Sequence, residues 1–250
     1  MNNSQRTEVN APRPAGLIRL AIRLKQVFLL WLLAASVAMA QERVALIIGN
    51  SAYDGSAALR NPGNDAVDLS AALDRIGFNT TLASDVTLSQ LQVALREFAH
   101  RAASADMAVL YFAGHGVEID GTNYVLPVDA QIETPRDVPF VSVELAHLLR
   151  AVEGAESLRL VILDACRNNP FTTRMASLTR SIRRGLAQVE PAGGVVVAYA
   201  ARGGTVAFDG EGRNSPFAAA LLDHIETPGL EIGRFFRLVR DSVYRRTAGQ

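Results

Sequence analysis

The sequence predicts an α/β fold, in which a mostly parallel, doubly wound sheet of about five or six strands carries helices on both faces. Three observations predict this class. Short, nearly all-apolar runs recur along the chain at the length of buried strands. Segments in which apolar residues repeat at helical spacing separate most of these runs. The length of 250 residues suggests one large or two small domains, and the hydrophobic content of 49% is ample for a core.

Five of the apolar runs are predicted to be parallel strands. They cover residues 43–49, 78–83, 107–113, a run that begins at Val161, and residues 194–200. A further segment, residues 117–126, is predicted to form a hairpin with Asp120 and Gly121 at its turn, because this dipeptide suits a tight two-residue connection.

The helices are predicted from apolar spacing and from capping residues. Four N-caps are expected: Asn64, Thr87 (which forms a capping box with Gln90), Ser142 and Ser215, which precedes a proline. The first, second and fourth of these helices are expected to run to about residues 76, 103 and 225, and a last amphipathic helix covers about residues 231–246.

Residues 1–40 have the pattern of a signal peptide and are left out of the fold prediction. Arg13, Arg19, Arg23 and Lys25 give a positive region ahead of an apolar run at residues 27–37, and Ala38-Met39-Ala40 suits a cleavage site. A membrane anchor is the alternative, but the uncharged run of residues 27–40 is shorter than the ~20 residues that span a bilayer. We therefore expect a protein that is exported to the periplasm or secreted and meets the membrane only during export.

The charge of the remaining chain argues against some partners. Residues 1–40 carry five of the 25 basic residues and one of the 25 acidic residues, so residues 41–250 hold 20 basic and 24 acidic side chains, a net charge of −4. This balance predicts no nucleic-acid binding and no attraction to anionic membranes. The single cysteine, Cys166, cannot form an internal disulfide and is expected to be a free thiol.

Two residues at predicted strand ends suggest nucleophilic chemistry. Cys166 follows the apolar run that begins at Val161, and His115 stands between two glycines after residues 107–113. The carboxyl ends of parallel strands meet at one edge of a sheet, so a thiol and an activating imidazole are expected together there. The backbone N–H groups of Gly116 and Cys166 are candidates for an oxyanion hole. The alternatives are a small buried cysteine and a histidine in a surface loop.

Other chemistries lack their signatures. The sequence contains no metal-ligand spacing, no P-loop, no G-x-G-x-x-G fingerprint and no G-x-S-x-G elbow. The three remaining histidines are expected to be solvated or interfacial: His100, His147 and His224. We predict no metal and no cofactor.

Four ordered motifs resemble a known family. They are RVALIIGN at residues 43–50, LRNPGNDA at 59–66, YFAGHG at 111–116 and LDACRNN at 163–169. The chain resembles the caspase-type cysteine peptidases, and in particular their bacterial metacaspase-like (orthocaspase) branch. The resemblance implies a caspase-like sandwich and a cysteine-type endopeptidase with His115 and Cys166 as its catalytic dyad.

The resemblance also divides the chain and suggests a specificity. It implies a large-subunit-like part at residues 41–171, a basic linker at 172–191 and a small-subunit-like part at 192–250. The metacaspase-like branch places acidic residues in the pocket for the substrate's P1 residue, and here these are Asp65 and Asp164. Such carboxylates favour protein or peptide substrates with arginine or lysine at P1. The alternatives are a helix-dipole partner for Asp65 and a loop acceptor for Asp164.

Two further expectations concern regulation. The linker contains four arginines at which such an enzyme can cut itself: Arg174, Arg180, Arg183 and Arg184. The alternative is that this segment is only a solvated basic loop. Calcium dependence occurs in the family, but the acidic residues after the hairpin do not have the regular spacing of calcium ligands: Asp129, Glu133 and Asp137. A catalytically silent scaffold that binds protein partners, or a cysteine hydrolase or transferase that acts on other substrates, are the competing functions.

Overall fold

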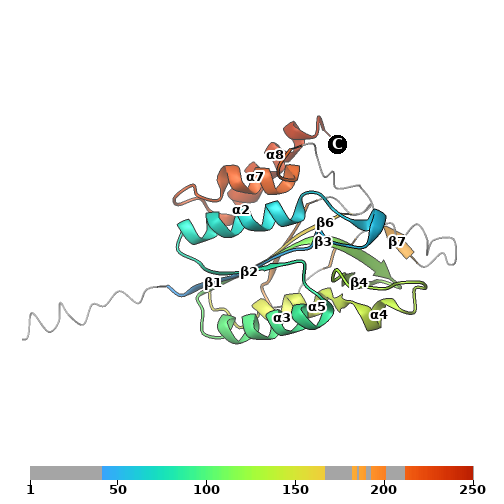
Figure 1. The fold of residues 1–250 in the computed structure, drawn as a ribbon. Coiled ribbons are helices and arrows are strands. Elements are labelled where there is room, and N and C mark those ends of the chain that lie inside the picture. Colours follow the sequence, from blue (N-terminus) through green and yellow to red (C-terminus); the bar gives the residue numbers. More distant parts are fainter. Residues whose placement is uncertain (1–40, 167–181, 185, 190–192, 201–211, 250) are drawn as a thin grey trace, which may run out of the picture. The chain divides into compact units, whose positions relative to one another are not determined.

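The computed structural model describes residues 41–166, 182–184, 186–189, 193–200 and 212–249 (Figure 1). For Ser56, Cys166 and residues 182–184, it describes the backbone alone. The predicted signal peptide and most of the basic linker lie outside the described residues.

A five-stranded parallel sheet forms the centre, as the sequence predicts. Its order is β2-β1-β3-β6-β8, with every neighbouring pair parallel. The strands are β1 (Arg43–Gly49), β2 (Asn79–Ser84), β3 (Met107–Ile119), β6 (Leu158–Cys166) and β8 (Val196–Tyr199). β3 is central, so that its residues pair with β1 on one side and with β6 on the other.

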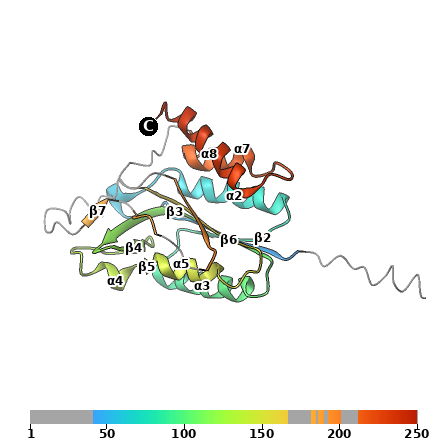
Figure 2. The same cartoon turned by 180° about the vertical axis from the view of Figure 1, so that it is seen from behind.

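Helices cover both faces of this sheet, which confirms the predicted α/β class. One face carries α2 (Pro62–Arg75), α7 (Pro216–His224) and α8 (Ile232–Arg246), and the other carries α3 (Leu88–Ala102) and α5 (Leu145–Val152) (Figures 1 and 2). A single turn, α4 (Val138–Val141), precedes α5, and a short 3₁₀ helix, η1 (Gly55–Ala57), follows β1.

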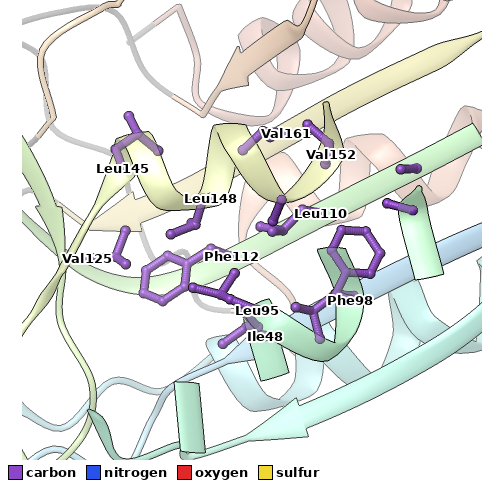
Figure 3. Packing of buried hydrophobic residues seen from close by; sticks show 14 of the residues in the cluster. Ile48, Leu95, Phe98, Leu110, Phe112, Val125, Leu145, Leu148, Val152 and Val161 are labelled. Atoms are coloured by element: carbon purple, nitrogen blue, oxygen red, sulfur yellow. The ribbon is translucent and has the colours of Figure 1, made fainter. Parts of the chain in front are cut away.

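The alternation of side chains along each strand builds two separate cores. On β1, Val44, Leu46 and Ile48 face α3 and α5, whereas Ala45 and Ile47 face α2 and α7. Successive side chains of a strand point to opposite faces, so an all-apolar strand supplies both cores at once. Figure 3 shows the first core, in which aromatic and aliphatic side chains from β3, α3 and α5 interdigitate.

β3 is longer than the sequence predicts. We expected it to end at residue 113, but it continues to Ile119, and its second half pairs antiparallel with β4 (Thr122–Val125) and β7 (Ile182–Arg184). β5 (Val143–Glu144) extends this part of the sheet by pairing with β4. The prediction failed because the glycines on either side of His115 resemble a strand end. The hairpin itself is confirmed, with positive φ at Asp120 (48°) and Gly121 (84°).

Two of the four predicted caps are confirmed. Thr87 forms the capping box with Gln90, and the Ser215 hydroxyl accepts a hydrogen bond from the Ala218 N–H. The other two are wrong, for local reasons given below.

Asn64 is not a cap, because α2 begins two residues earlier at Pro62, whose fixed φ suits the first helical position. Ser142 does not cap α5, which begins after Glu144. Its hydroxyl instead donates to the carbonyl oxygen of Val138, the first residue of α4. Within the described part of the chain, none of the helices combines the length and the apolar character needed to cross a bilayer.

Candidate active site

The register of the sheet brings the backbones of the two predicted catalytic residues together. Along the β3–β6 pair, Gly114 lies opposite Ala165 and His115 lies opposite Cys166. Cys166 is the last residue of β6. The two residues therefore occupy adjacent strands at the same level of the sheet, toward the carboxyl ends of the parallel strands.

His115 is held on several sides and is fully buried. Its backbone N–H donates to the Tyr53 hydroxyl (3.0 Å), and the two rings pack with their centroids 4.5 Å apart. Its Nε2 lies 2.7 Å from the carbonyl oxygen of Ala57 in η1. A carbonyl oxygen can only accept, so Nε2 carries the proton, and in the neutral ring Nδ1 is the basic nitrogen.

The glycines beside His115 make room for other parts of the protein. A Cβ at Gly114 would lie 2.6 Å from the Tyr53 hydroxyl oxygen, and a Cβ at Gly116 would lie 2.8 Å from Leu186 Cδ2. A larger residue at Gly114 would displace Tyr53, which contacts His115, and a larger residue at Gly116 would displace Leu186. The two glycines beside His115 therefore have a role in packing. The role of the Gly116 N–H in an oxyanion hole stays a prediction.

Tyr53 and Ala57 were missed at the sequence level. They lie in residues 50–63, which the sequence marks only as a polar loop. Tyr53 is buried, and its hydroxyl donates to the carbonyl oxygen of Leu126 (2.9 Å). An aromatic residue in an otherwise polar loop was the available signal, but nothing in the sequence pairs it with His115.

The two predicted specificity carboxylates lie close together and are nearly fully buried. Asp65 belongs to the first turn of α2 and is 1% exposed, and Asp164 on β6 is 5% exposed. Ser215 connects them, since its N–H donates to Asp65 Oδ1 (3.0 Å) and its hydroxyl donates to Asp164 Oδ2 (2.6 Å). The hydroxyl of Tyr111 also donates to Asp164 Oδ2 (3.3 Å).

This arrangement changes the ionisation of Asp65. Burial, and then the neighbouring charge of Asp164, raise the pKa of Asp65 to about 7, while hydrogen bonds from Asn214 and Ser215 oppose the shift. Two adjacent buried carboxylates resist carrying two negative charges together. The net charge of the pair is therefore sensitive to pH near neutrality.

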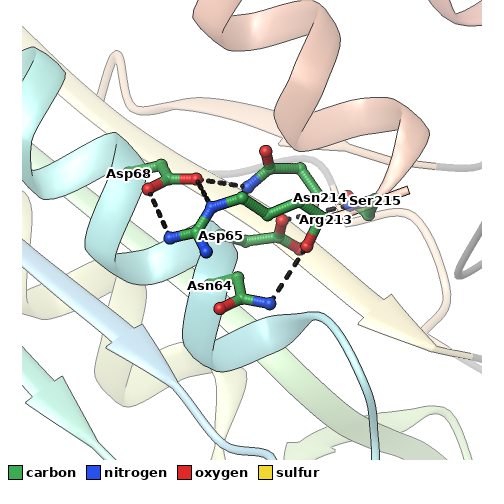
Figure 4. A network of polar contacts seen from close by, with 6 residues as sticks. All are labelled: Asn64, Asp65, Asp68, Arg213, Asn214 and Ser215. Carbon is green, nitrogen blue, oxygen red and sulfur yellow. Dashed lines mark hydrogen bonds and ion pairs between the residues drawn. The ribbon is translucent and has the colours of Figure 1, made fainter.

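A second polar network lies beside this pair (Figure 4). Arg213 forms a two-pronged ion pair with Asp68 on α2, with N–O distances of 2.9 and 3.0 Å. The side-chain amide of Asn214 donates to Asp68 Oδ2 (2.9 Å), and that of Asn64 donates to the carbonyl oxygen of Arg213 (3.2 Å). The guanidinium of Arg213 holds the pKa of Asp68 below its ordinary value.

The predicted linker arginines are described only in part. Arg183 and Arg184 belong to β7, where their backbones pair with Glu118 and Val117 of β3. Arg174 and Arg180 lie outside the described residues.

The acidic residues after the hairpin take part in local hydrogen bonds. Asp129 accepts from the Leu88 N–H at the start of α3, and Asp137 accepts from the N–H groups of Glu133 and Thr134. Among the described residues, no group of three or more histidine, cysteine or acidic side chains is placed to hold a metal ion.

The other histidines lie on the helices. His100 and His147 are exposed, and His224 is half-buried, with its Nε2 2.9 Å from the Ser242 hydroxyl.

Comparison with known proteins identifies the family. A family model described as "Caspase domain" matches residues 42–250. The chain belongs to the caspase-domain family. This caspase-domain chain is also similar to human mucosa-associated lymphoid tissue lymphoma translocation protein 1, at 31% identity over 130 residues, and to its mouse homolog at the same identity and length. The match covers 52% of the chain but only 15% of the length of either relative.

A solved structure supports the fold of this caspase-domain chain. Protein GSU0716 from Geobacter sulfurreducens superposes with a TM-score of 0.58 at 15% identity, over 82% of this chain and 89% of that one. At this identity the likeness concerns the fold alone. Together with the family match, it confirms the caspase-like α/β sandwich that the four motifs imply.

Proposed function

We propose that this caspase-domain chain is a cysteine endopeptidase that uses His115 and Cys166 and cleaves after arginine or lysine. The register of β3 and β6, which sets the backbones of these two residues opposite each other, carries the proposal. The family match supports the class of enzyme. The buried carboxylates Asp65 and Asp164 support the preference for a basic residue.

The orientation of His115 suggests how the dyad works. With Nε2 held by Ala57, Nδ1 accepts the thiol proton of Cys166, and the resulting thiolate attacks the peptide carbonyl carbon. Nδ1 then donates this proton to the leaving amine, and a water molecule hydrolyses the thioester in the second half of the reaction. The N–H groups of Gly116 and Cys166 stabilise the oxyanion in each half.

The carboxylate pair accounts for the proposed specificity. A guanidinium or ammonium group entering between Asp65 and Asp164 forms charge-assisted hydrogen bonds that no aspartate side chain can form. Ser215 and Tyr111 already donate to these carboxylates and hold their oxygens in place. A negatively charged P1 residue would be repelled by the same pair.

Self-processing in the basic linker forms part of the proposal. The backbones of Arg183 and Arg184 are paired with β3, and a paired strand is a poor substrate because a peptidase binds an extended, accessible segment. We therefore expect cleavage after Arg174 or Arg180. Intact-mass measurement of the wild type beside Cys166→Ala tests this expectation, and identical fragments in both proteins would exclude self-processing.

Export is proposed on the signal-peptide pattern of residues 1–40. N-terminal sequencing of the protein recovered from the periplasm or medium of an expressing bacterium should give a start near Gln41. Recovery of an intact N-terminus from the cytoplasm alone would contradict the proposal.

The decisive experiment measures activity on fluorogenic peptides that end in arginine, lysine or aspartate, with and without calcium. We expect turnover of the arginine and lysine peptides, and loss of turnover in both Cys166→Ala and His115→Ala. His147→Ala, a change at an exposed histidine on α5, is the matched control and should keep full activity. An arginyl chloromethylketone should label Cys166. A folded wild type that neither cleaves nor reacts would be a silent scaffold.

A further inference from the structure

Three consecutive residues ahead of α7, which we call the 213–215 segment (Arg213, Asn214 and Ser215), all bind to the region around the two buried carboxylates. Ser215 donates to Asp65 and Asp164 directly. Asn214 hydrogen-bonds to Asp65 and to Asp68, and Arg213 pairs with Asp68 through two bonds. The contacts become more exposed along the segment, from buried Ser215 to the largely solvated Arg213 side chain.

We propose that the Asp68–Arg213 ion pair is a positioning element for the P1 pocket, because it fixes the 213–215 segment against Asp65 and Asp164 and sets a positive charge beside them. The inference rests on the proposed function, since it assigns a role within the same pocket. Arg213 is a positioning residue in this scheme. It acts on the substrate only through the carboxylates.

The geometry favours a positioning role over a merely stabilising one. Asp65 and Asp68 are three residues apart on α2, so they lie on neighbouring turns of one helix face. A guanidinium that grips a carboxylate with two parallel bonds fixes direction as well as distance. An ion pair this exposed contributes little to the stability of the fold. Its main effect is therefore to fix the position of the 213–215 segment.

Charge gives the second argument. The ionisable groups of the described elements around Asp65 are Asp164 on β6, Asp68 on α2 and Arg213, with the Tyr111 hydroxyl on Asp164. Arg213 is a cation among them. Its hydrogen bond to Asp68, the charge of Asp68 and, to a smaller extent, the charge of Asp65 raise the pKa of Arg213. Removing Arg213 takes a positive charge away from Asp68 and Asp65, which makes the ionised form of Asp65 harder to reach.

The chain offers a matched control for this ion pair. Arg75 near the end of α2 pairs with Glu226 beyond the end of α7 at 2.6 Å. Like Asp68–Arg213, this pair is exposed and links α2 to the α7 region. It lies at the opposite end of α2 from Asp65, so Arg75→Gln removes the same charge without touching the carboxylates.

The test follows the titration of Asp65 by carboxyl ¹³C NMR in the full chain, with Asp65→Asn to assign its signal. The wild-type midpoint is expected near the pKa of about 7. Arg213→Gln should move the midpoint upward by roughly half a pH unit, whereas Arg213→Lys, which keeps the charge, should restore it. Arg75→Gln should leave it unchanged. An unmoved midpoint in Arg213→Gln, or an equal shift in Arg75→Gln, would overturn the inference.

Kinetics on an arginyl peptide gives the matching functional readout. Arg213→Gln should raise KM several-fold at pH 7 with a smaller change in kcat, and should shift the acid limb of kcat/KM toward higher pH. Asp68→Asn, which frees the 213–215 segment while keeping Arg213, should also raise KM. An unchanged KM in both variants, in an enzyme that cleaves the peptide, would overturn the positioning role. If the wild type cleaves no arginyl peptide, the proposed function fails, while the NMR result still decides whether Arg213 controls Asp65.

Discussion

The two faces of the sheet use the same strands for different purposes. On the side of α3 and α5, the core is filled by fully buried aromatic and aliphatic side chains, such as Phe112 and Leu148 (Figure 3). On the side of α2, α7 and α8, the buried pair lies near the carboxyl ends of the strands, with Asp164 on β6 and Asp65 in the first turn of α2. Toward the amino ends, the same side encloses a mainly apolar cavity of about 390 Å³.

Neighbouring residues of β3 make the contrast clear. Phe112 belongs to the core under α3 and α5, whereas Tyr111 belongs to the opposite core and donates its hydroxyl to Asp164. The first face is therefore packed with apolar side chains up to the carboxyl ends of the strands. The second face holds polar groups that a core built for stability alone would exclude.

The largest effect is expected from Leu148→Ala on the well-packed face. Leu148 is fully buried between α5 and the sheet, so its loss should destabilise the fold by about 4 kcal/mol through lost contacts and the cavity left behind. Urea unfolding followed by circular dichroism measures the change. The P1 preference of the folded fraction should stay the same, and an altered preference would break the division between the faces.

The next effect concerns stability and pH at Asp65. Its pKa is raised from 3.8 to about 7 in the folded state, so its contribution to stability is fully present below pH 3.8 and is lost as the pH rises through about 7. Asp65→Asn removes this dependence. We compare the free energy of unfolding of Asp65→Asn with that of the wild type. The difference, variant minus wild type, should increase by about 3 kcal/mol from pH 5 to pH 8, because only the wild type loses stability over this range. If the free energy of unfolding in urea depended on pH in the same way for both proteins, the folded state would ionise Asp65 without a loss of stability, which would contradict the prediction.

A somewhat smaller effect is expected from Asp164→Asn on activity. The loss of one charge-assisted partner for the P1 side chain should lower kcat/KM for an arginyl peptide about 100-fold, which equals about 2.7 kcal/mol. The rate at which iodoacetamide alkylates Cys166 should be nearly the same in Asp164→Asn as in the wild type. Asp223→Asn, on the exposed surface of α7, is the control and should be silent. An equal loss on peptides with neutral P1 residues would argue against a pocket role for Asp164.

The smallest effect is expected from Leu73→Ala, the same substitution on the other face. Leu73 lines the cavity, so its side chain has fewer contacts to lose, and we expect a cost of about 2 kcal/mol. Leu73→Phe should be close to neutral because the cavity can accept the larger ring, whereas Leu148→Phe should destabilise. Thermal unfolding of the four variants measures this difference. Equal costs at Leu73 and Leu148 would mean that the two faces are packed alike.

Local signals in the sequence predicted the parts of the fold that depend on near neighbours. The apolar runs gave the parallel strands, and the caps at Thr87 and Ser215 were correct because the groups they satisfy lie three residues away. The length of β3 was predicted wrongly, since a glycine beside His115 looks the same whether it ends a strand or admits Tyr53. The family resemblance brought Asp65 and Asp164 together, although it gave no reason for their proximity.

The sequence by itself determined the order of strands and helices along the chain and the apolar character of both cores. It also determined the presence of a thiol, an imidazole and two carboxylates at strand or helix ends. Only the tertiary structure decided which nitrogen of His115 carries the proton, why Gly114 must be a glycine, and that Ser215 joins the two carboxylates. The physical reason is distance along the chain. Periodicity and capping act within a few residues, whereas the contact of Arg213 with Asp68 spans 145 residues and exists only once the sheet and α2 have packed.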